Sequence, residues 1–361
     1  MAALKKRHIY ILLLALLSAA FHLLAGQRQL MNAIAGATLK LRQAIARLCA
    51  PAPFSVAEAL CTLGVAALLA WLVWLTVSLL RSRGRRLLTL WRRLSLLLAV
   101  LLSIYFLLCL FLGASYRADG FQEKSGLKAR PSSPETLCEV TAWFARGLAE
   151  TAELVQREAD GSFAVPLDRL LADAKDIYRG AERQYPFLQL QDDSPKPVFF
   201  SRLMSRFNYT GFYFPFTGEA NLNVDIPLCM IPSTAAHEMA HQRGISSEQE
   251  ANFVAILACL ESGNDAYIYG GWLFGFLHLG GALYRSSPES YFRLLELLPP
   301  EVLRDIQDNN EYWDQFETKA AEVSEKVYDG LLKSYGHSMG VQSYGAVVDL
   351  LIAWYAQLQE L

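Results

Sequence analysis

The chain has little of what disulfide-rich or nucleic-acid-binding proteins use. Its 361 residues include only six cysteines, which lie far apart without a C-x-x-C pair. This spacing favours neither a disulfide framework nor a cysteine zinc site. The formal net charge is −2, so the chain has no excess of basic residues with which to bind a nucleic acid. We find no internal repeat, but 53% of the residues are hydrophobic, which is high for a soluble domain.

Three long apolar segments occupy the first third of the chain. They are "IYILLLALLSAAFHLLAG" (9–26), "AEALCTLGVAALLAWLVWLTVSLL" (57–80) and "LSLLLAVLLSIYFLLCLFLGAS" (94–115). Because a span needs about 20 mostly apolar residues, we predict a membrane region over 1–115 with a span in each segment. The basic "KKR" before the first segment is also typical of a signal peptide, but no small-residue cleavage site follows, so we expect an uncleaved span.

The arginines predict the orientation of these spans. Six of them lie between the second and third segments, in "RSRGRRLLTLWRR" (81–93), and such clusters stay in the cytoplasm. Three spans that start inside end outside. We therefore predict a multi-pass cell-membrane protein whose C-terminal domain is extracytoplasmic. The segment "MNAIAGATLKLRQAIARL" (31–48) is amphipathic and is expected to lie on the lipid bilayer surface.

The rest of the chain predicts a linker over 116–133 and a globular domain over 134–361. Helical periodicity begins at Pro134 and returns over 166–186. The aromatic, Gly-punctuated stretch 196–228 favours short strands and turns. The apolar run 266–284 contains five glycines and lies between polar helices, so we expect a buried core helix rather than a fourth span. The expected fold class is mainly α with a small sheet.

The stretch "STAAHEMAHQRGISSEQEANF" (233–253) carries an HExxH motif in His237, Glu238 and His241. Helical residues four apart share a face, so both imidazoles would bind one metal ion, for which we expect Zn²⁺. Glu238 would take a proton from water whose pKa the zinc lowers. By chance alone the motif occurs in about one in a hundred chains of this length, so its surroundings must support the assignment.

A third zinc ligand is expected on the next helix. Gly244 is suited to end the motif helix, which we expect to begin with Ser233 or Thr234 as its N-cap. The following turn would bring Glu248 or Glu250 back towards the histidines. Catalytic zinc usually has three protein ligands and an open position, and spacing alone leaves both glutamates as candidates.

The pair "HEMAHQRG" (237–244) and "EQEANF" (248–253) resembles the gluzincin branch of zinc metallopeptidases. This resemblance implies a glutamate ligand on the later helix, with an amide or carboxylate four residues further on that supports a histidine. Glu248 with Asn252 fits this pattern, whereas Glu250 would pair with Val254, so the resemblance favours Glu248. It also implies a zincin-like α(+β) domain that hydrolyses a peptide or protein substrate.

A wider resemblance covers nearly the whole chain. The layout is similar to that of an uncharacterised bacterial membrane family, a domain of unknown function with an HExxH motif, for which no substrate is known. The matching stretches are "PFSVAEAL" (53–60), "GFYFPFTGEANLN" (211–223), "HEMAHQRG" (237–244), "EQEANF" (248–253) and "GVQSYGAVVDLLIAWY" (340–355).

Two further assignments and one rival function remain open at this stage. The stretch 210–225 resembles the edge strand that binds substrate backbone in zincins, although a structural hairpin fits equally well. Tyr344 is our candidate donor for the transition-state oxyanion, although most tyrosines are packing residues, and His278 is expected in the core. The rival to a zinc metallopeptidase is a non-catalytic zinc-binding or structural membrane protein of the cell envelope.

Overall fold

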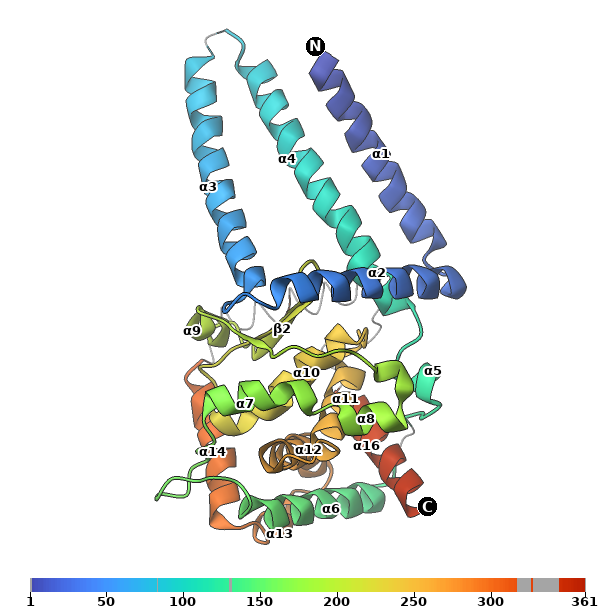
Figure 1. The fold of residues 1–361 in the computed structure, drawn as a ribbon, viewed down its shortest axis with the longest axis vertical. Helices are drawn as coiled ribbons and strands as arrows, with labels where there is room; N and C mark the ends of the chain where they lie inside the picture. The colour runs from blue at the N-terminus through green and yellow to red at the C-terminus, as the bar shows by residue number, and fades with distance from the viewer. Residues whose placement is uncertain (1, 83, 130–131, 317–325, 327–343, 361) are drawn as a thin grey trace.

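The structure, a computed structural model, has three long helices at one end and a mainly helical domain at the other (Figure 1). It describes residues 2–82, 84–129, 132–316, 326 and 344–360. Within these ranges three helices are long and apolar enough to cross a membrane, as the sequence predicts. The long helices are α1 (Ala2–Leu24), α3 (Val56–Arg81) and α4 (Arg86–Leu108), and a π-helical turn (Cys109–Gly113) continues α4.

Helix α2 (Arg28–Cys49) lies across the ends of these spans, between them and the domain (Figure 1). It is amphipathic, and it buries Met31, Thr38 and Arg42. Leu41 and Leu48 are exposed. A helix of this kind that lies roughly perpendicular to the spans is typical of the membrane–water interface.

The segment 116–133, predicted as a linker, is instead largely folded onto the domain. It contains a 3-10 turn (Ser115–Arg117) and α5 (Phe121–Ser125). Phe121 is fully buried, and its ring lies 5.3 Å from that of Phe253. One buried aromatic among polar neighbours gives no periodic signal, which explains why the sequence predicts a tether here.

The domain is built around α12 (Asp265–Ser286), which packs against α6, α10 and α11 and confirms the predicted buried helix. The predicted helix over 166–186 is divided, and the turn between its halves lets both Ile177 and Tyr178 reach the core. The other helices are α6 (Pro134–Ala152), α7 (Leu167–Asp173), α8 (Arg179–Gln184), α9 (Ser201–Ser205), α10 (Ile231–Gln242), α11 (Glu248–Leu260), α13 (Pro288–Leu295), α14 (Pro300–Asp314) and α16 (Tyr344–Gln359).

A small sheet lies between α2 and the helices of the domain. Its strands are β1 (Lys196–Pro197), β2 (Gly211–Phe214) and β3 (Glu219–Leu222), in the order β1-β3-β2. β1 pairs with β3 in parallel, and β2 pairs with β3 as an antiparallel hairpin. β2 is therefore an edge strand within the described part of the chain.

The sheet is fastened directly to the start of span α3. The carboxylate of Glu219 accepts hydrogen bonds from the backbone N–H groups of Val56 (3.2 Å) and Ala57 (2.8 Å). The Ser55 hydroxyl donates to Asn221 Oδ1 at 2.6 Å. Because the first N–H groups of a helix have no partner within it, Glu219 satisfies two donors that would otherwise be orphaned, and the membrane region and the domain become one folded unit.

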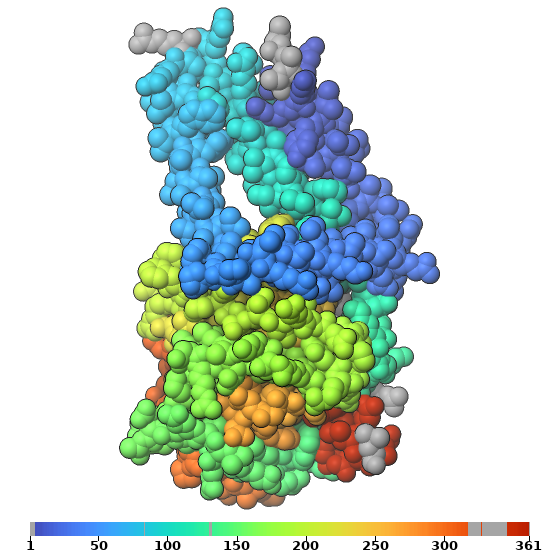
Figure 2. Space-filling model, in the orientation of Figure 1, coloured from blue at the N-terminus to red at the C-terminus, as the bar shows by residue number. Residues whose placement is uncertain are grey.

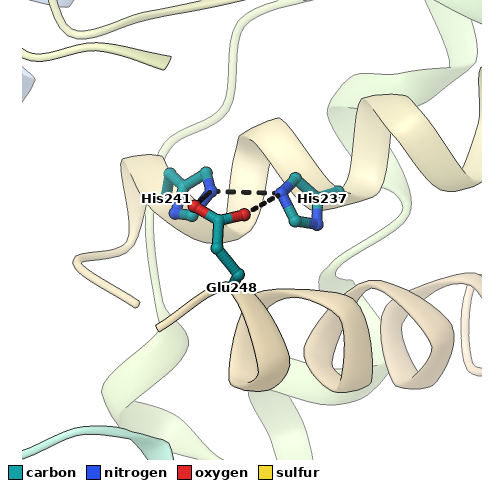
Figure 3. A group of neighbouring side chains, drawn as sticks. All are labelled: His237, His241 and Glu248. Atoms are coloured by element: carbon teal, nitrogen blue, oxygen red, sulfur yellow. Dashed lines mark hydrogen bonds and ion pairs between the residues drawn. The ribbon is translucent and has the colours of Figure 1, made fainter. Parts of the chain in front are cut away.

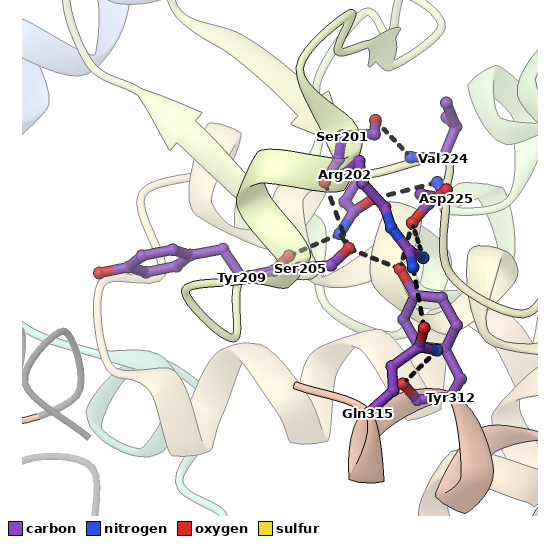
Figure 4. A network of polar contacts seen from close by, with 9 residues as sticks. Ser201, Arg202, Ser205, Tyr209, Val224, Asp225, Tyr312 and Gln315 are labelled. Carbon is purple, nitrogen blue, oxygen red and sulfur yellow. Dashed lines mark hydrogen bonds and ion pairs between the residues drawn. The ribbon is translucent and has the colours of Figure 1, made fainter. Parts of the chain in front are cut away.

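A polar network joins α9 to the segment after β3 and to α14 (Figure 4). Ser201 Oγ accepts from Val224 N (2.9 Å). Arg202 Nη1 and the Tyr312 hydroxyl both donate to Asp225 Oδ2, at 3.0 and 2.7 Å. The network therefore holds α9 against α14 and the segment that follows β3.

Candidate metal centre

The motif helix α10 begins earlier than the sequence predicts. Its first residue is Ile231, and Pro232 lies in the first turn, where its missing N–H costs no hydrogen bond. Ser233, a predicted N-cap, is inside the helix, and its hydroxyl donates to Met230 O at 3.1 Å. The helix therefore starts before the predicted N-cap residues, but the HExxH residues keep the helical register that the motif requires.

The turn after α10 has the geometry that its glycine predicts. Gly244 has a φ of 81°, a conformation that favours glycine. Its N–H bonds His241 O (3.0 Å), and Ile245 N bonds Ala240 O (3.2 Å), which closes the helix in a Schellman-type arrangement. Ser247 then caps α11, so the first turn of α11 lies against the histidine face of α10.

His237, His241 and Glu248 meet at one point between the two helices (Figure 3). The two Nε2 atoms are 3.1 Å apart. Glu248 Oε2 is 3.3 Å from His237 Nε2, and Glu248 Oε1 is 3.7 Å from His241 Nε2. One ligand atom from each residue lies within 4.8 Å of the others, and the side chains are 12–20% exposed. The three groups are close enough together to hold one metal ion.

The backbone fixes the orientation of His241. Its Nδ1 lies 2.7 Å from the carbonyl oxygen of Ile245. A carbonyl only accepts hydrogen bonds, so Nδ1 donates the proton, and the neutral ring then keeps a lone pair on Nε2. That lone pair points at the same place as His237 Nε2 and Glu248. A hydrogen bond from the outer ring nitrogen is typical of histidines that bind metals.

The electrostatics of the group favour a positive charge at its centre. Burial lowers the pKa of His241, but the nearby Glu248 carboxylate more than offsets this and raises the pKa to about 9. For Glu248, burial raises the pKa, whereas His241 and His237 hold it well below its ordinary value. Glu248 therefore stays ionised and favours a positive charge beside the two imidazoles. Such a site is chemically suited to a divalent metal ion.

Glu238 lies beside the group on the same helix but is more deeply buried, with 4% exposure. Burial raises its pKa to about 7, against the opposing effect of the two histidines. Its Oε2 atom is buried and has no hydrogen-bond partner among the described residues. Edge strand β2 passes directly over it, since a Cβ on Gly211 would lie 2.6 Å from Glu238 Oε1. Glycine at this position allows the close approach.

The structure places Glu250, the other candidate ligand, away from the histidines. Its carboxylate accepts from the backbone N–H groups of Phe121 (2.7 Å) and Gln122 (3.0 Å) at the start of α5. Asn252, which the gluzincin resemblance implied as a support for a histidine, makes no hydrogen bond to His237 or His241 in the part of the chain that the structure describes. Its expected role is filled for His241 by the Ile245 carbonyl.

Two further residues from the sequence analysis are Tyr344 and His278. Tyr344 is the first residue of α16, but its side chain lies outside the described residues, so its role as an oxyanion donor stays a prediction. His278 lies on the central helix α12, and its pKa is lowered to about 4 by burial and by the proximity of His237. Tyr213 of β2, which no motif in the sequence indicates, also lies at the site: its ring centroid is 6.4 Å from that of His241.

A buried ionic cluster that no local sequence pattern predicts packs against α10. The fully buried side chain of Arg243 lies 3.0 Å from Glu182 Oε1 and also bonds Asp192. Its guanidinium stacks on Tyr178 at 3.5 Å from the ring centroid, and the Tyr178 hydroxyl donates to Ala236 O at 2.6 Å. The cluster ties the middle and the C-terminal end of the motif helix to one scaffold.

Fold and site together define a membrane protein whose helical domain carries a His–His–Glu cluster. The chain belongs to a family of proteins of unknown function, DUF3810, whose sequence profile matches residues 38–352. The matched region starts in α2 and includes the sheet, the motif helix and most of α16. Neither the curated proteins nor the solved structures include a match to this chain. The family gives no activity, so the function must be argued from the site.

Proposed function

We propose that this protein is a membrane-anchored zinc metallopeptidase that hydrolyses peptide bonds. The observation that carries the proposal is the convergence of His237, His241 and Glu248 on one point beside the buried carboxylate of Glu238. Two imidazoles and one carboxylate are a ligand set of catalytic zinc sites. These are also the ligand types that the gluzincin resemblance implies, which supports the proposal.

The residues fit zinc in number and chemistry. Three protein ligands leave a coordination position open, as catalytic sites require, whereas structural zinc sites usually have four. Within the described residues the group has three members. Zinc bound there would act as a Lewis acid and would lower the pKa of water.

In this proposal Glu238 transfers the protons. Its carboxylate would take a proton as water adds to the peptide carbonyl, and would return it to the leaving amine as the C–N bond breaks. Burial already favours its protonated form, since its pKa lies near 7, and a pKa near the working pH suits a group that both accepts and donates. His241, fixed by Ile245, would hold its ligand atom in place during these steps.

The position of edge strand β2 favours a peptide as the substrate. Its residues Gly211 and Tyr213 face Glu238 and His241 respectively, so the strand runs along the site. An extended peptide that paired with its free edge would lie across the catalytic groups. β2 would thus be both part of a hairpin and the wall that receives substrate.

We further propose that the domain is extracytoplasmic. The described arginines of 81–93 lie at the ends of α3 and α4 farthest from the domain (Figure 1). Since such clusters remain in the cytoplasm, the domain would lie on the opposite side of the membrane.

The test is hydrolysis by the purified full-length protein in detergent, loaded with zinc and given a fluorogenic peptide library. We expect cleavage by the wild type, and a loss of at least about a hundredfold in Glu238→Gln with its zinc retained. Equal activity in the two proteins would contradict the proposal. Bound zinc without any hydrolysis that depends on Glu238 would instead favour a non-catalytic zinc protein.

A further inference from the structure

The candidate site lies on the side of the domain that faces the spans. Leu39 of α2 lies against the turn after α10, since a Cβ on Gly244 would be 3.4 Å from Leu39 Cδ2. Gln242, the residue after His241, donates from Nε2 to the carbonyl oxygen of Gly218 at 2.8 Å. The end of α10 therefore contacts both α2 and the β2–β3 hairpin. One helix diameter, about 10 Å, separates this end from the level of the spans.

The tip of the β2–β3 hairpin reaches the level of the spans. Figure 2 shows it in yellow, past α2 and between α3 and α4. The ring of Phe216 lies 5.8 Å from that of Phe111, which belongs to the π-helical continuation of α4, and 5.5 Å from that of Phe214. An aromatic tip packed on the end of a span is placed at the membrane interface.

Strand β2 leads from the candidate site to this tip. It begins at Gly211, against Glu238, and ends at Phe214, at the start of the tip. Thr210 O accepts a hydrogen bond from Asn223 N (3.0 Å). In an antiparallel pair the bonded residues alternate, so the N–H and C=O groups of Gly211 and Tyr213 point away from β3, at the free edge. Four strand residues cover about 13 Å, so a short extended peptide would connect the site with the bilayer surface.

We infer that the substrate is a polypeptide anchored in the membrane on the N-terminal side of the bond that is cleaved, and that the cut lies within about eight residues of the anchor. This inference rests on the proposed peptidase function. Antiparallel pairing is the more stable kind, and β2 runs from the site towards the membrane. An antiparallel peptide therefore runs from the membrane to the site, with its N-terminal end at the bilayer.

The spans leave room for such an anchor. Figure 2 shows an open space between α3 and α4 directly above the hairpin tip. No residue in the most apolar window of α3 is buried, so this helix can face lipid or an apolar helix of another chain. A transmembrane helix of the substrate in this space would deliver its extracytoplasmic segment to the membrane end of β2.

The experiment uses the zinc-loaded full-length protein in lipid nanodiscs and a library of about ten randomised residues in three forms. One form carries a hydrophobic Leu/Ala helix at its N-terminus, the second carries the same helix at its C-terminus, and the third is free. The C-terminally anchored form is the matched control, because it has the same concentration at the membrane surface. We expect the N-terminally anchored form to be cleaved at least about tenfold faster than both others, with cuts near the anchor, and Glu238→Gln to cleave none.

The inference would be overturned if the C-terminally anchored form or the free form were cleaved as fast as the N-terminally anchored form. The direction in which the substrate lies along β2 would then not matter. Cuts spread evenly along the library would also overturn it. These results leave the peptidase activity itself intact. If no form of the library shows cleavage that depends on Glu238, the proposed function is overturned, and the inference falls with it.

Discussion

The layer of the domain that faces the spans differs in kind from the layer farthest from them. The far layer, in which α6, α13 and α16 pack against the far side of the central helix α12, is aromatic: the ring of Trp143 lies within 6 Å of those of Phe144, Trp272, Trp354 and Tyr355. The near layer is held by buried polar contacts, in which carboxylates accept from the backbone at the starts of α3 and α5. The far layer is therefore held mainly by aromatic packing, whereas buried polar contacts hold the near layer, which contains the candidate metal centre.

The largest expected effect tests the far layer. Phe144 is fully buried, and its ring packs on Trp143 and Trp272. Phe144→Ala should cost about 3–5 kcal/mol of unfolding free energy, because it leaves a cavity. The molecules that still fold should keep their full metal content, which thermal unfolding and metal analysis would measure together. Loss of metal from the folded variant would break the comparison.

The next effect separates buried from exposed ion pairs. Arg243→Met leaves the carboxylates of Glu182 and Asp192 without their guanidinium in a fully buried site, and should cost about 3–5 kcal/mol. The matched control is Arg202→Met, whose pair with Asp225 is largely exposed (Figure 4) and should cost about 0–1 kcal/mol. Similar melting temperatures for the two variants would contradict the buried network.

A smaller, pH-dependent effect comes from Glu238. In the metal-free protein burial raises its pKa from 4.5 to about 7. The folded state then binds this proton more tightly than the unfolded state, so stability falls as pH rises through this window. Metal-free Glu238→Gln should therefore be more stable than the wild type above pH 7, by up to about 3 kcal/mol, and the gap should close towards pH 4.5. Melting curves from pH 5 to 8 measure it, and a gap that does not change with pH would contradict the burial of Glu238.

The smallest effect distinguishes the two glutamates of α11. Glu250→Gln weakens two hydrogen bonds to the start of α5 and should cost about 1–2 kcal/mol while zinc remains bound. Glu248→Gln should lower zinc affinity with little loss of stability in the metal-free protein. Isothermal titration measures the zinc affinity of each variant, and thermal unfolding measures the stability of each metal-free variant. An exchange of these two outcomes would move the third ligand to Glu250.

Much of the near layer could be predicted from the sequence, because its signals are local. The apolar runs predict the spans, the amphipathic period predicts α2, and the HExxH spacing with Gly244 predicts a helix, a turn and a second helix. Spacing alone does not separate Glu248 from Glu250, because both lie in the first turn of α11; the gluzincin resemblance is what favours Glu248.

The rest depends on contacts between residues that are distant in sequence. Glu250 meets Phe121 and Gln122, and Glu219 meets Val56 and Ala57, each across more than a hundred positions. No local pattern shows that a carboxylate will cap a distant helix. For the same reason, the sequence predicts a linker over 116–133, although Phe121 lies in the core.

The central claim is that His237, His241 and Glu248 bind one metal ion, and the most direct test is metal content. The full-length protein and its His237→Ala, Glu248→Ala and Glu250→Ala variants would be purified in detergent and analysed by mass spectrometry for bound metal. We predict about one zinc per chain in the wild type and in Glu250→Ala, and loss of zinc in the other two variants. A well-folded wild type that binds no metal when supplied with zinc would contradict the account.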